Sequence, residues 1–305
     1  MDAPLFVKTD SSARRIGLLA GWGRYPIIVA EALKRAGYEI YCLGIRDHAD
    51  PKLAEICADF DWLGLARLGK AVRYFRRHGL NQAVMAGKIH KVRLFDRGAW
   101  RQIVPDWLTV RTFAAHFITL RRDRRDDTLL SAITATFARA GITFRPATDF
   151  APELLVNKGC LTRRRPTAGQ EIDIWFGWEL AKELGRLDIG QSVVVKGQAA
   201  LAVEAIEGTD ACIRRAGELC RSGEFVVVKV AKPQQDMRFD VPTIGLGTLE
   251  TLVAAGGAVL AIEAGRTIVL DEPQLVDFAN RHGLVVVAVD AADAQTAKCR
   301  VPTAA

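Results

Sequence analysis

The segment from Lys229 to Thr243 (KVAKPQQDMRFDVPT) gathers side chains that could carry out chemistry on a phosphate group. Its basic residues can neutralise phosphate oxygens, and its two carboxylates can hold a divalent cation or orient a water. Phosphoryl transfer needs both kinds of group, because charge builds on the oxygens as the bond breaks. The candidates are Lys229, Lys232, Arg238, Asp236 and Asp240. The composition is equally typical of a salt-bridged surface loop, and spacing alone does not choose between the two interpretations.

Two acidic segments stand where helices are predicted to begin. The run Gly208-Thr209-Asp210 lies between a predicted strand and a helix, so free backbone N–H groups and an acid occur there together. Asp126 and Asp127 precede another predicted helix, where negative charge interacts favourably with the helix dipole. Both patterns are compatible with ligand binding and with ordinary helix capping.

A glycine turn near the N-terminus is a third candidate. Gly21 and Gly23 follow a predicted strand, and a predicted helix begins at Pro26, so backbone N–H groups and the helix dipole could face a phosphate. Pro26 stands where the dinucleotide-binding fingerprint has its third glycine, which disfavours classical NAD binding. Nucleotide binding and a plain tight turn both remain open.

Several familiar catalytic motifs are missing from the sequence. It has no Walker A loop, no HExxH run and no GxSxG elbow, and its five histidines are scattered without ligand spacing. A metal, if one is bound, should therefore be a hard cation held by oxygen ligands. The six cysteines show no CxxC spacing, and we expect reduced thiols in the cytosol.

The overall composition is that of a folded globular protein. Half of the 305 residues are hydrophobic and a quarter are charged, and no apolar run reaches the roughly 18 residues that cross a bilayer. The net charge of +7 is compatible with a nucleic acid, an anionic membrane surface or a phosphorylated substrate. The arginine-rich runs at 121–125 and 163–165 carry no interleaved aromatics, which disfavours nucleic acid as a partner.

The elements that must position these residues are predicted to form two α/β domains. In the first half, strands are expected at 16–20, 40–44 and 81–86, and helices at 26–36 and 69–78. This alternation predicts parallel βαβ units in a Rossmann-like domain, with ligands bound at the carboxyl ends of the strands. Residues 104–139 are predicted to be mainly helical.

A second α/β domain is expected after a linker. Residues 157–170 are rich in Gly, Pro, Thr and Arg and lack periodicity, so we place the boundary there. Residues 1–156 would then bind the nucleotide or substrate, and residues 171–305 would form a catalytic domain with a mixed sheet. Its first elements are predicted as a helix at 172–184, a hairpin of 193–196 and 200–206, a helix to about 220 and a buried strand at 225–231.

Several of these runs resemble one known family. GRLDIGQSVVVKGQAALAVEAIEGTDACIRRAG and KVAKPQQDMRFDVPTIGLGTLE are similar to the C-terminal domain of the UDP-2,3-diacylglucosamine pyrophosphatase family of the lipid A pathway. GLLAGWGRYP, MAGKI and RRDDTLL resemble its N-terminal domain. The resemblance implies magnesium-dependent hydrolysis of UDP-2,3-diacylglucosamine to UMP and 2,3-diacylglucosamine 1-phosphate. It also implies a cytoplasmic homodimer in peripheral contact with the inner membrane.

The resemblance and the residue patterns described above together assign roles to individual residues. Asp240 falls on the aspartate that family members need for turnover, as a metal ligand or as the base for an attacking water. Asp210, Asp236 and Asp240 are the expected ligands of Mg²⁺. The expected contacts to the acylated UDP-sugar are Gly21, Gly23, Lys88, Asp126, Asp127, Thr209, Lys229, Lys232, Gln235, Arg238 and Thr243.

Two functions of other classes remain as alternatives. A non-catalytic sensor that binds a nucleotide or lipid precursor would keep the basic residues and the glycine turn, but it would not need Asp236 and Asp240. A nicotinamide-dependent oxidoreductase would need the dinucleotide fingerprint that Pro26 interrupts. The two carboxylates favour an enzyme.

Overall fold

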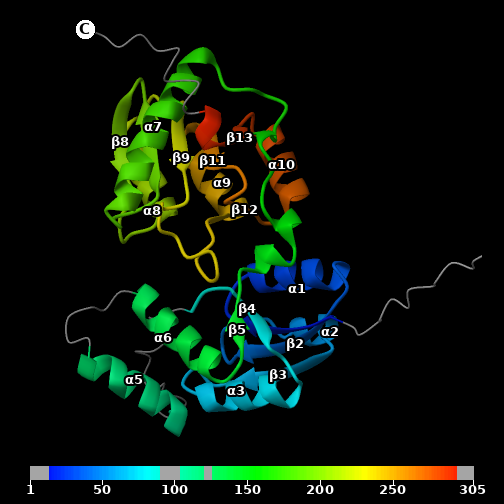
Figure 1. Cartoon of the computed structure of the whole chain (residues 1–305). Helices are drawn as coiled ribbons and strands as arrows, with labels where there is room; N and C mark the ends of the chain where they lie inside the picture. Colours follow the sequence, from blue (N-terminus) through cyan, green and yellow to red (C-terminus); the bar gives the residue numbers. More distant parts are fainter. Residues whose placement is uncertain (1–13, 90–103, 120–125, 294–305) are drawn as a thin grey trace, which may run out of the picture. The chain divides into compact units, whose positions relative to one another are not determined.

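The computed structural model describes residues 14–89, 104–119 and 126–293, which form two compact units (Figure 1). The units are Met1–Ala151 and Pro152–Ala305, and each contains its own main sheet. Residues 157–170, expected as a linker, contribute strand β6 to the second sheet. No helix within the described ranges is long and apolar enough to cross a lipid bilayer.

The N-terminal unit is built on a five-stranded parallel sheet in the order β3-β2-β1-β4-β5. Its strands are β1 (Arg14–Ala20), β2 (Tyr38–Ile45), β3 (Asp59–Leu63), β4 (Gln82–Ala86) and β5 (Thr143–Phe144). Its helices are α1 (Tyr25–Arg35), α2 (Leu53–Ile56), α3 (Leu68–Arg77), α5 (Trp107–Thr119) and α6 (Asp126–Arg139). The predicted Rossmann-like architecture is confirmed.

Strand β3 was not predicted from the sequence. Its first four residues, DFDW, alternate between polar and apolar side chains as in a strand, but the run is short, and four of the five residues of β3 are only partly buried. The strand pairs with the edge of β2 from Tyr41 to Ile45. The short alternation was the signal that could have found it.

The order of the strands places a switch point between β1 and β4. From β1 the chain adds β2 and then β3 on one side, and it returns to add β4 on the other side of β1. In open parallel sheets, ligands bind at the carboxyl ends of the two strands where the direction reverses. The loops that follow Ala20 and Ala86 are therefore the natural ligand-binding loops of this unit.

The C-terminal unit has a six-stranded mixed sheet in the order β6-β13-β11-β9-β7-β8. Its strands are β6 (Gly159–Cys160), β7 (Ser192–Lys196), β8 (Ala199–Val203), β9 (Phe225–Lys229), β11 (Gly257–Glu263) and β13 (Val285–Val289). A separate two-residue pair joins β10 (Thr243–Ile244) to β12 (Ile268–Val269). The helices are α7 (Ala168–Arg186), α8 (Thr209–Leu219), α9 (Leu246–Ala254) and α10 (Glu272–Arg281). The predicted mixed sheet and the predicted β7–β8 hairpin are confirmed.

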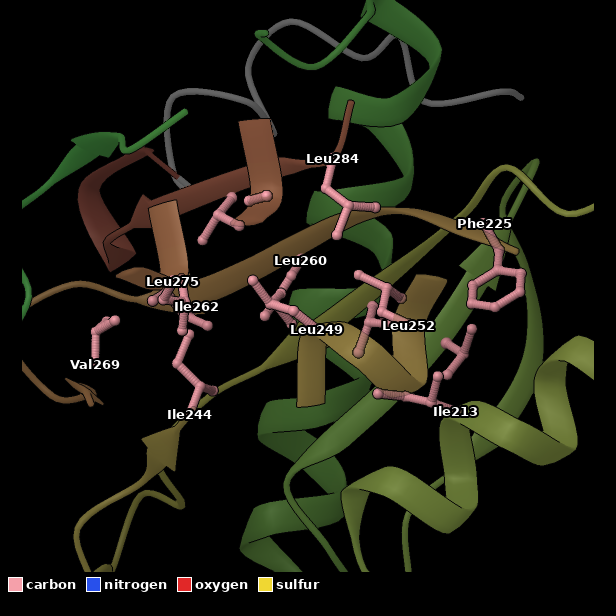
Figure 2. Packing of buried hydrophobic residues seen from close by; sticks show 14 of the residues in the cluster. Ile213, Phe225, Ile244, Leu249, Leu252, Leu260, Ile262, Val269, Leu275 and Leu284 are labelled. Atoms are coloured by element: carbon pink, nitrogen blue, oxygen red, sulfur yellow. The ribbon is translucent and has the colours of Figure 1, made fainter. Parts of the chain in front are cut away.

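Alternate residues of the central strands feed two separate cores. On β9, Val227 joins the core beneath α8, α9 and α10, whereas Val226 and Val228 join the core beneath α7. Figure 2 shows the first core, where side chains of α9 such as Leu252 meet Phe225 and Leu260 of the sheet. The strands are buried on both faces, which explains their continuous apolar sequences.

Helix α7 approaches its face of the sheet closely at Gly177. A Cβ added there would lie 2.7 Å from Cγ2 of Val228 and 3.1 Å from Cγ2 of Val195. We expect Gly177→Ala to destabilise the C-terminal unit by about 1–3 kcal/mol through overpacking, although alanine favours helix by about 1 kcal/mol. Gly169 of the same helix has no atom within 4 Å of an added Cβ, so Gly169→Ala is the matched control. Urea midpoints should fall for the first variant only, and equal midpoints would contradict the close packing.

Candidate functional site

Polar residues of the C-terminal unit collect at one edge of its sheet. Strands β9, β11 and β13 are parallel and end at this edge, while β7, which runs in the opposite direction, begins there. Their terminal residues Lys229, Glu263 and Ser192 are all buried, as is Glu204 just beyond β8. The loop 230–242 between β9 and β10, which contains the predicted polar loop 232–242, leaves the same edge from β9 (Figure 1). The edge therefore combines buried charges with the loop that carries Asp240.

The first part of this loop is fixed to a buried ion pair. Lys182 of α7 lies 2.6 Å from Oε2 of Glu263, and the Lys182 ammonium also donates to the carbonyl of Ala231 at 3.0 Å. The Ala231 N–H donates to the same Glu263 oxygen at 2.7 Å. Burial lowers the pKa of the Lys182 ammonium, and its hydrogen bond to Glu263 opposes that effect. The pair thus holds both backbone groups of Ala231 at the start of the loop.

Two further contacts tie the loop to the end of α7. The Nζ of Lys232 lies 2.7 Å from Oδ1 of Asp188, and Nε2 of Gln234 donates to the carbonyl of Gly185 at 2.8 Å. A Cβ at Gly185 would lie 3.1 Å from Cα of Lys232, so the helix end and the loop backbone are in close contact. Lys232, expected to bind substrate, is paired with an acid in this structure.

The last part of the loop returns to the opposite face of the sheet. The buried Lys229 donates from Nζ to the carbonyl of Thr243 at 3.1 Å. The next residue, Ile244, belongs to the core beneath α8, α9 and α10, whereas α7 and Lys182 cover the other face. Lys229 and Thr243 are therefore brought together as expected, through the backbone of the threonine.

Inside the loop, the two carboxylates have different partners. Asp236 accepts two hydrogen bonds from Nε of Arg238, at 2.9 and 3.0 Å, and this contact lowers the pKa of its carboxyl. Asp240 is exposed, and its Oδ2 accepts from Nε2 of Gln235 at 2.6 Å. Oε1 of Gln235 accepts the Lys232 N–H at 2.8 Å. The amide of Gln235 thus positions Asp240, while Asp236 and Arg238 form an ion pair with each other.

The three expected magnesium ligands do not form a common site among the described residues. Asp236 is held by Arg238, and Oδ1 of Asp210 accepts from Oγ1 of Thr248 at 3.1 Å. No group of three or more His, Cys, Asp or Glu side chains within the described ranges is arranged to hold a metal ion. Mg²⁺ is usually bound by one or two carboxylates together with substrate phosphates. The donor set fits such a shared site, with Asp240 as the protein ligand, and does not fit a site made of protein alone.

The start of α8 lies at the same edge of the sheet. Gly208 precedes the helix with φ of 83°, and no side chain caps the first turn. Oγ1 of Thr209 donates to Oε1 of Glu204 at 3.1 Å and lies 3.3 Å from Oγ of Ser192. Thr209 was expected to contact substrate, but its hydroxyl proton points to Glu204 in this structure.

The switch point of the N-terminal unit brings Gly21 and Lys88 together. The Trp22 N–H donates to the Lys88 carbonyl at 2.7 Å, and the Lys88 N–H donates back to the Trp22 carbonyl at 3.0 Å. A Cβ at Gly21 would lie 2.8 Å from the Lys88 carbonyl oxygen, so only glycine allows this approach. The Gly21 N–H donates to the Ala86 carbonyl at 2.8 Å. The Gly21 N–H is therefore used inside the fold and does not face a phosphate. Facing a phosphate was one of the two possibilities that the sequence left open for this turn.

The remaining predicted site residues are only partly placed. Gly23 has φ of 106°, and no atom lies within 4 Å of a Cβ added there, so its surroundings are open. Asp126 and Asp127 were predicted to precede a helix and are instead the first residues of α6, and their side chains lie outside the described residues.

Three buried polar residues and one partly buried lysine at the C-terminal edge were missed by the sequence analysis. The buried residues are Ser192, Glu204 and Glu263, and the lysine is Lys182. Glu263 ends the apolar run AVLAIE, and Glu204 directly follows the run ALAV. A charged residue at the end of a buried strand was the signal that could have found both. Lys182 lies one helical turn after the buried Trp178, on the face that α7 turns toward the sheet.

Comparisons with known proteins agree over nearly the whole chain. Residues 15–154 match the LpxI N-terminal domain, and residues 157–287 match the LpxI C-terminal domain. The chain is 33% identical over 285 residues to the UDP-2,3-diacylglucosamine pyrophosphatase LpxI of Caulobacter vibrioides. The similarity covers 91% of this chain and 98% of that protein.

The buried ion pair predicts how the loop responds to loss of a charge. We expect Glu263→Gln to destabilise the C-terminal unit by about 2–3 kcal/mol, because it leaves the Lys182 ammonium partly buried without its counter-ion. The segment after Ala231 should loosen as well, and trypsin should cleave faster after Arg238. Urea unfolding and timed proteolysis measure the two effects.

The matched control for this prediction is Glu183→Gln on the same helix. Glu183 pairs with Arg186 at 2.8 Å, but both side chains are more than half exposed. Exposed pairs contribute little, so stability and cleavage should both stay near those of the unchanged chain. Equal effects from the two variants would show that Glu263 does not anchor the loop.

Proposed function

The chain belongs to the LpxI family, and from that premise we propose that it hydrolyses UDP-2,3-diacylglucosamine to UMP and 2,3-diacylglucosamine 1-phosphate. The observation that carries this function is the match of both family domains, in order, together with 33% identity to a pyrophosphatase of that substrate. The reaction is a step of lipid A biosynthesis. It makes the protein a hydrolase that acts on a phosphoric anhydride.

The reaction places clear demands on the protein. The oxygen of a water molecule forms a bond to one phosphorus, and the bond from that phosphorus to the bridging oxygen breaks. The bridging oxygen leaves with the other phosphate and carries the negative charge that develops on it. The water must lose a proton, and a negatively charged leaving phosphate must be stabilised. Residues at the C-terminal edge offer the exposed acid Asp240 and several basic side chains for these tasks.

Asp240 is the residue that we propose for the chemical step. Gln235 holds it by a 2.6 Å hydrogen bond in an exposed loop, where a substrate can reach it. It would accept the proton of the attacking water or bind a cation beside the diphosphate. Lys229 lies at the base of this loop, and Lys232 and Arg238 lie within it, each paired with an acid that a phosphate group would have to replace.

We propose magnesium as the cofactor, shared between Asp240 and the diphosphate of the substrate. When bound, a hard divalent cation stabilises the charge that develops on phosphate oxygens. Asp236 contributes charge rather than a ligand in this arrangement, because its oxygens accept hydrogen bonds from Arg238. Gln235 keeps the Asp240 carboxylate oriented for the shared site.

The setting of the reaction is proposed from the substrate. Its two acyl chains belong in a bilayer, so we propose that the enzyme is cytoplasmic and contacts the inner membrane surface peripherally. The net charge of +7 supports attraction to an anionic leaflet. We also propose a homodimer, on the family resemblance, and no nucleic acid partner.

Removal of the Asp240 carboxylate tests the proposed chemistry. We expect Asp240→Asn to lower the rate of UMP release from UDP-2,3-diacylglucosamine by about 100-fold or more, because a positioned base or charge is lost. Circular dichroism should be unchanged, since the side chain is exposed. Asp277→Asn removes an exposed aspartate that pairs with Arg281 on α10, and it should keep full activity. Full activity in the Asp240 variant would exclude the assigned role.

Metal removal tests the cofactor separately. Treatment with EDTA should abolish UMP release, and added magnesium should restore it, because the diphosphate needs a counter-ion in the transition state. In the absence of substrate, magnesium should bind only weakly, since the described carboxylates do not form a site by themselves. Isothermal titration with and without a UDP-sugar measures this difference, and undiminished hydrolysis in EDTA would rule magnesium out.

A further inference from the structure

A row of three hydrogen-bonded side chains lies next to Lys229. Ser192 comes from the start of β7, Thr209 from the start of α8, and Glu204 from the residue after β8. Oγ of Ser192 lies 3.3 Å from Oγ1 of Thr209, which donates to Oε1 of Glu204 at 3.1 Å. The row therefore joins three elements that meet at one edge of the sheet.

The hydrogen bonds of this row all run in one direction, from donor to acceptor, toward Glu204. A carboxylate only accepts hydrogen bonds, and a threonine hydroxyl has a single proton to donate. Because Thr209 gives its proton to Glu204, its oxygen must accept from Ser192. The carboxylate at one end thus decides the orientation of both hydroxyl groups.

Glu204 is buried in a way that stability does not explain. Its residue is 7% exposed, and Oε2 has no hydrogen-bond partner among the described residues. A buried acceptor without a partner typically costs about 1–3 kcal/mol, and such groups call for a functional explanation or a bound water. The surrounding backbone keeps the residue in place, because a Cβ at Gly190 would lie 2.0 Å from the Glu204 carbonyl oxygen.

The other end of the row leads to the proposed site. Ser192 lies directly opposite Lys229 in the antiparallel pair of β7 and β9. Residues opposite each other in such a pair share a face of the sheet, with Cβ atoms about 5 Å apart. Ser192 is 1% exposed and Lys229 is 7% exposed, so both lie in a well-defined environment. Thr209 is the first residue of α8, whose uncapped N–H groups are suited to an anion.

We propose that Glu204 is a positioning residue for the hydrolysis described above. By accepting the Thr209 proton, it fixes the start of α8 and the Ser192 hydroxyl relative to Lys229, and so prepares this side of the site for the diphosphate. Glu204 itself does not touch the substrate. The inference rests on the proposed function, and it adds a residue that the family comparison does not assign.

A double-mutant cycle between Glu204 and Thr209 tests the proposal. Glu204→Gln removes the charge with little change of shape, and Thr209→Val removes the hydroxyl. In the full-length enzyme with magnesium, each should lower kcat by about tenfold and leave KM within about twofold, as expected for loss of one charge-assisted hydrogen bond. The double variant should be no worse than the poorer single variant, because Glu204→Gln weakens and Thr209→Val removes the same hydrogen bond.

Two controls separate positioning from folding. Thr209→Ser keeps the hydroxyl and should retain most of kcat. Glu218→Gln changes an exposed acid on α8 and should leave kcat and Tm unchanged. If Glu204→Gln does not fold, the comparison of Thr209→Val with Thr209→Ser still tests the row, because equal kcat values in those two variants would overturn the proposal.

Other outcomes are distinct. About 100-fold loss in the double variant would mean that the two residues act independently, which overturns the proposal. It is also overturned if the loss of kcat merely follows a loss of folded protein in thermal unfolding. Failure of the unchanged enzyme to release UMP would instead defeat the proposed function, and this is measured first.

Discussion

The contact between Lys182 and Glu263 governs the geometry of the C-terminal edge. It joins α7 to the end of β11 and also holds the backbone of Ala231, where the loop between β9 and β10 begins. A pair of charges in this position is worth little as a source of stability, because its attraction is largely offset by the loss of hydration. The pair instead fixes the geometry of the edge, because the two charged groups and the N–H and carbonyl of Ala231 can all be hydrogen-bonded in only one arrangement.

The two units hold the carboxyl ends of their parallel strands in place by different contacts. In the N-terminal unit, Gly21 and Gly87 allow the backbones after β1 and β4 to touch, and reciprocal hydrogen bonds between Trp22 and Lys88 close the contact. In the C-terminal unit, buried side chains such as Glu204 and Lys229 do the equivalent work. In both, the carboxyl ends of parallel strands are organised before any ligand arrives, which lowers the entropic cost of binding.

The fold could be predicted from the sequence where local pattern and final environment agree. Continuous apolar residues predict buried strands such as Val285–Val289, and the turn at Gly197 predicts the β7–β8 hairpin. Strand β3 was missed because its alternating run of four residues is short and its side chains are only partly buried, whereas its pairing with the edge of β2 is seen only in the folded chain.

The candidate site could be predicted only in part. Its central loop was evident from composition and family resemblance, yet the partners within it were not. The pairing of Asp236 with Arg238 and the bond from Thr209 to Glu204 depend on turns whose shape the residue types do not specify. Lys182 and Glu263 are 81 positions apart, and their contact exists only once the helix lies on the sheet.

The loop after β9 is attached at Ala231 to one face of the sheet and at Thr243 to the other. The residues between Asp236 and Val241 belong to neither packed core. Apart from the proposed Asp240, these residues can therefore be substituted without opening the interior, while the attachments at Ala231 and Thr243 hold the two ends of the loop in place. Changes at the exposed part of this loop therefore leave both packed cores intact. Related proteins can differ in substrate preference there and still keep the same fold.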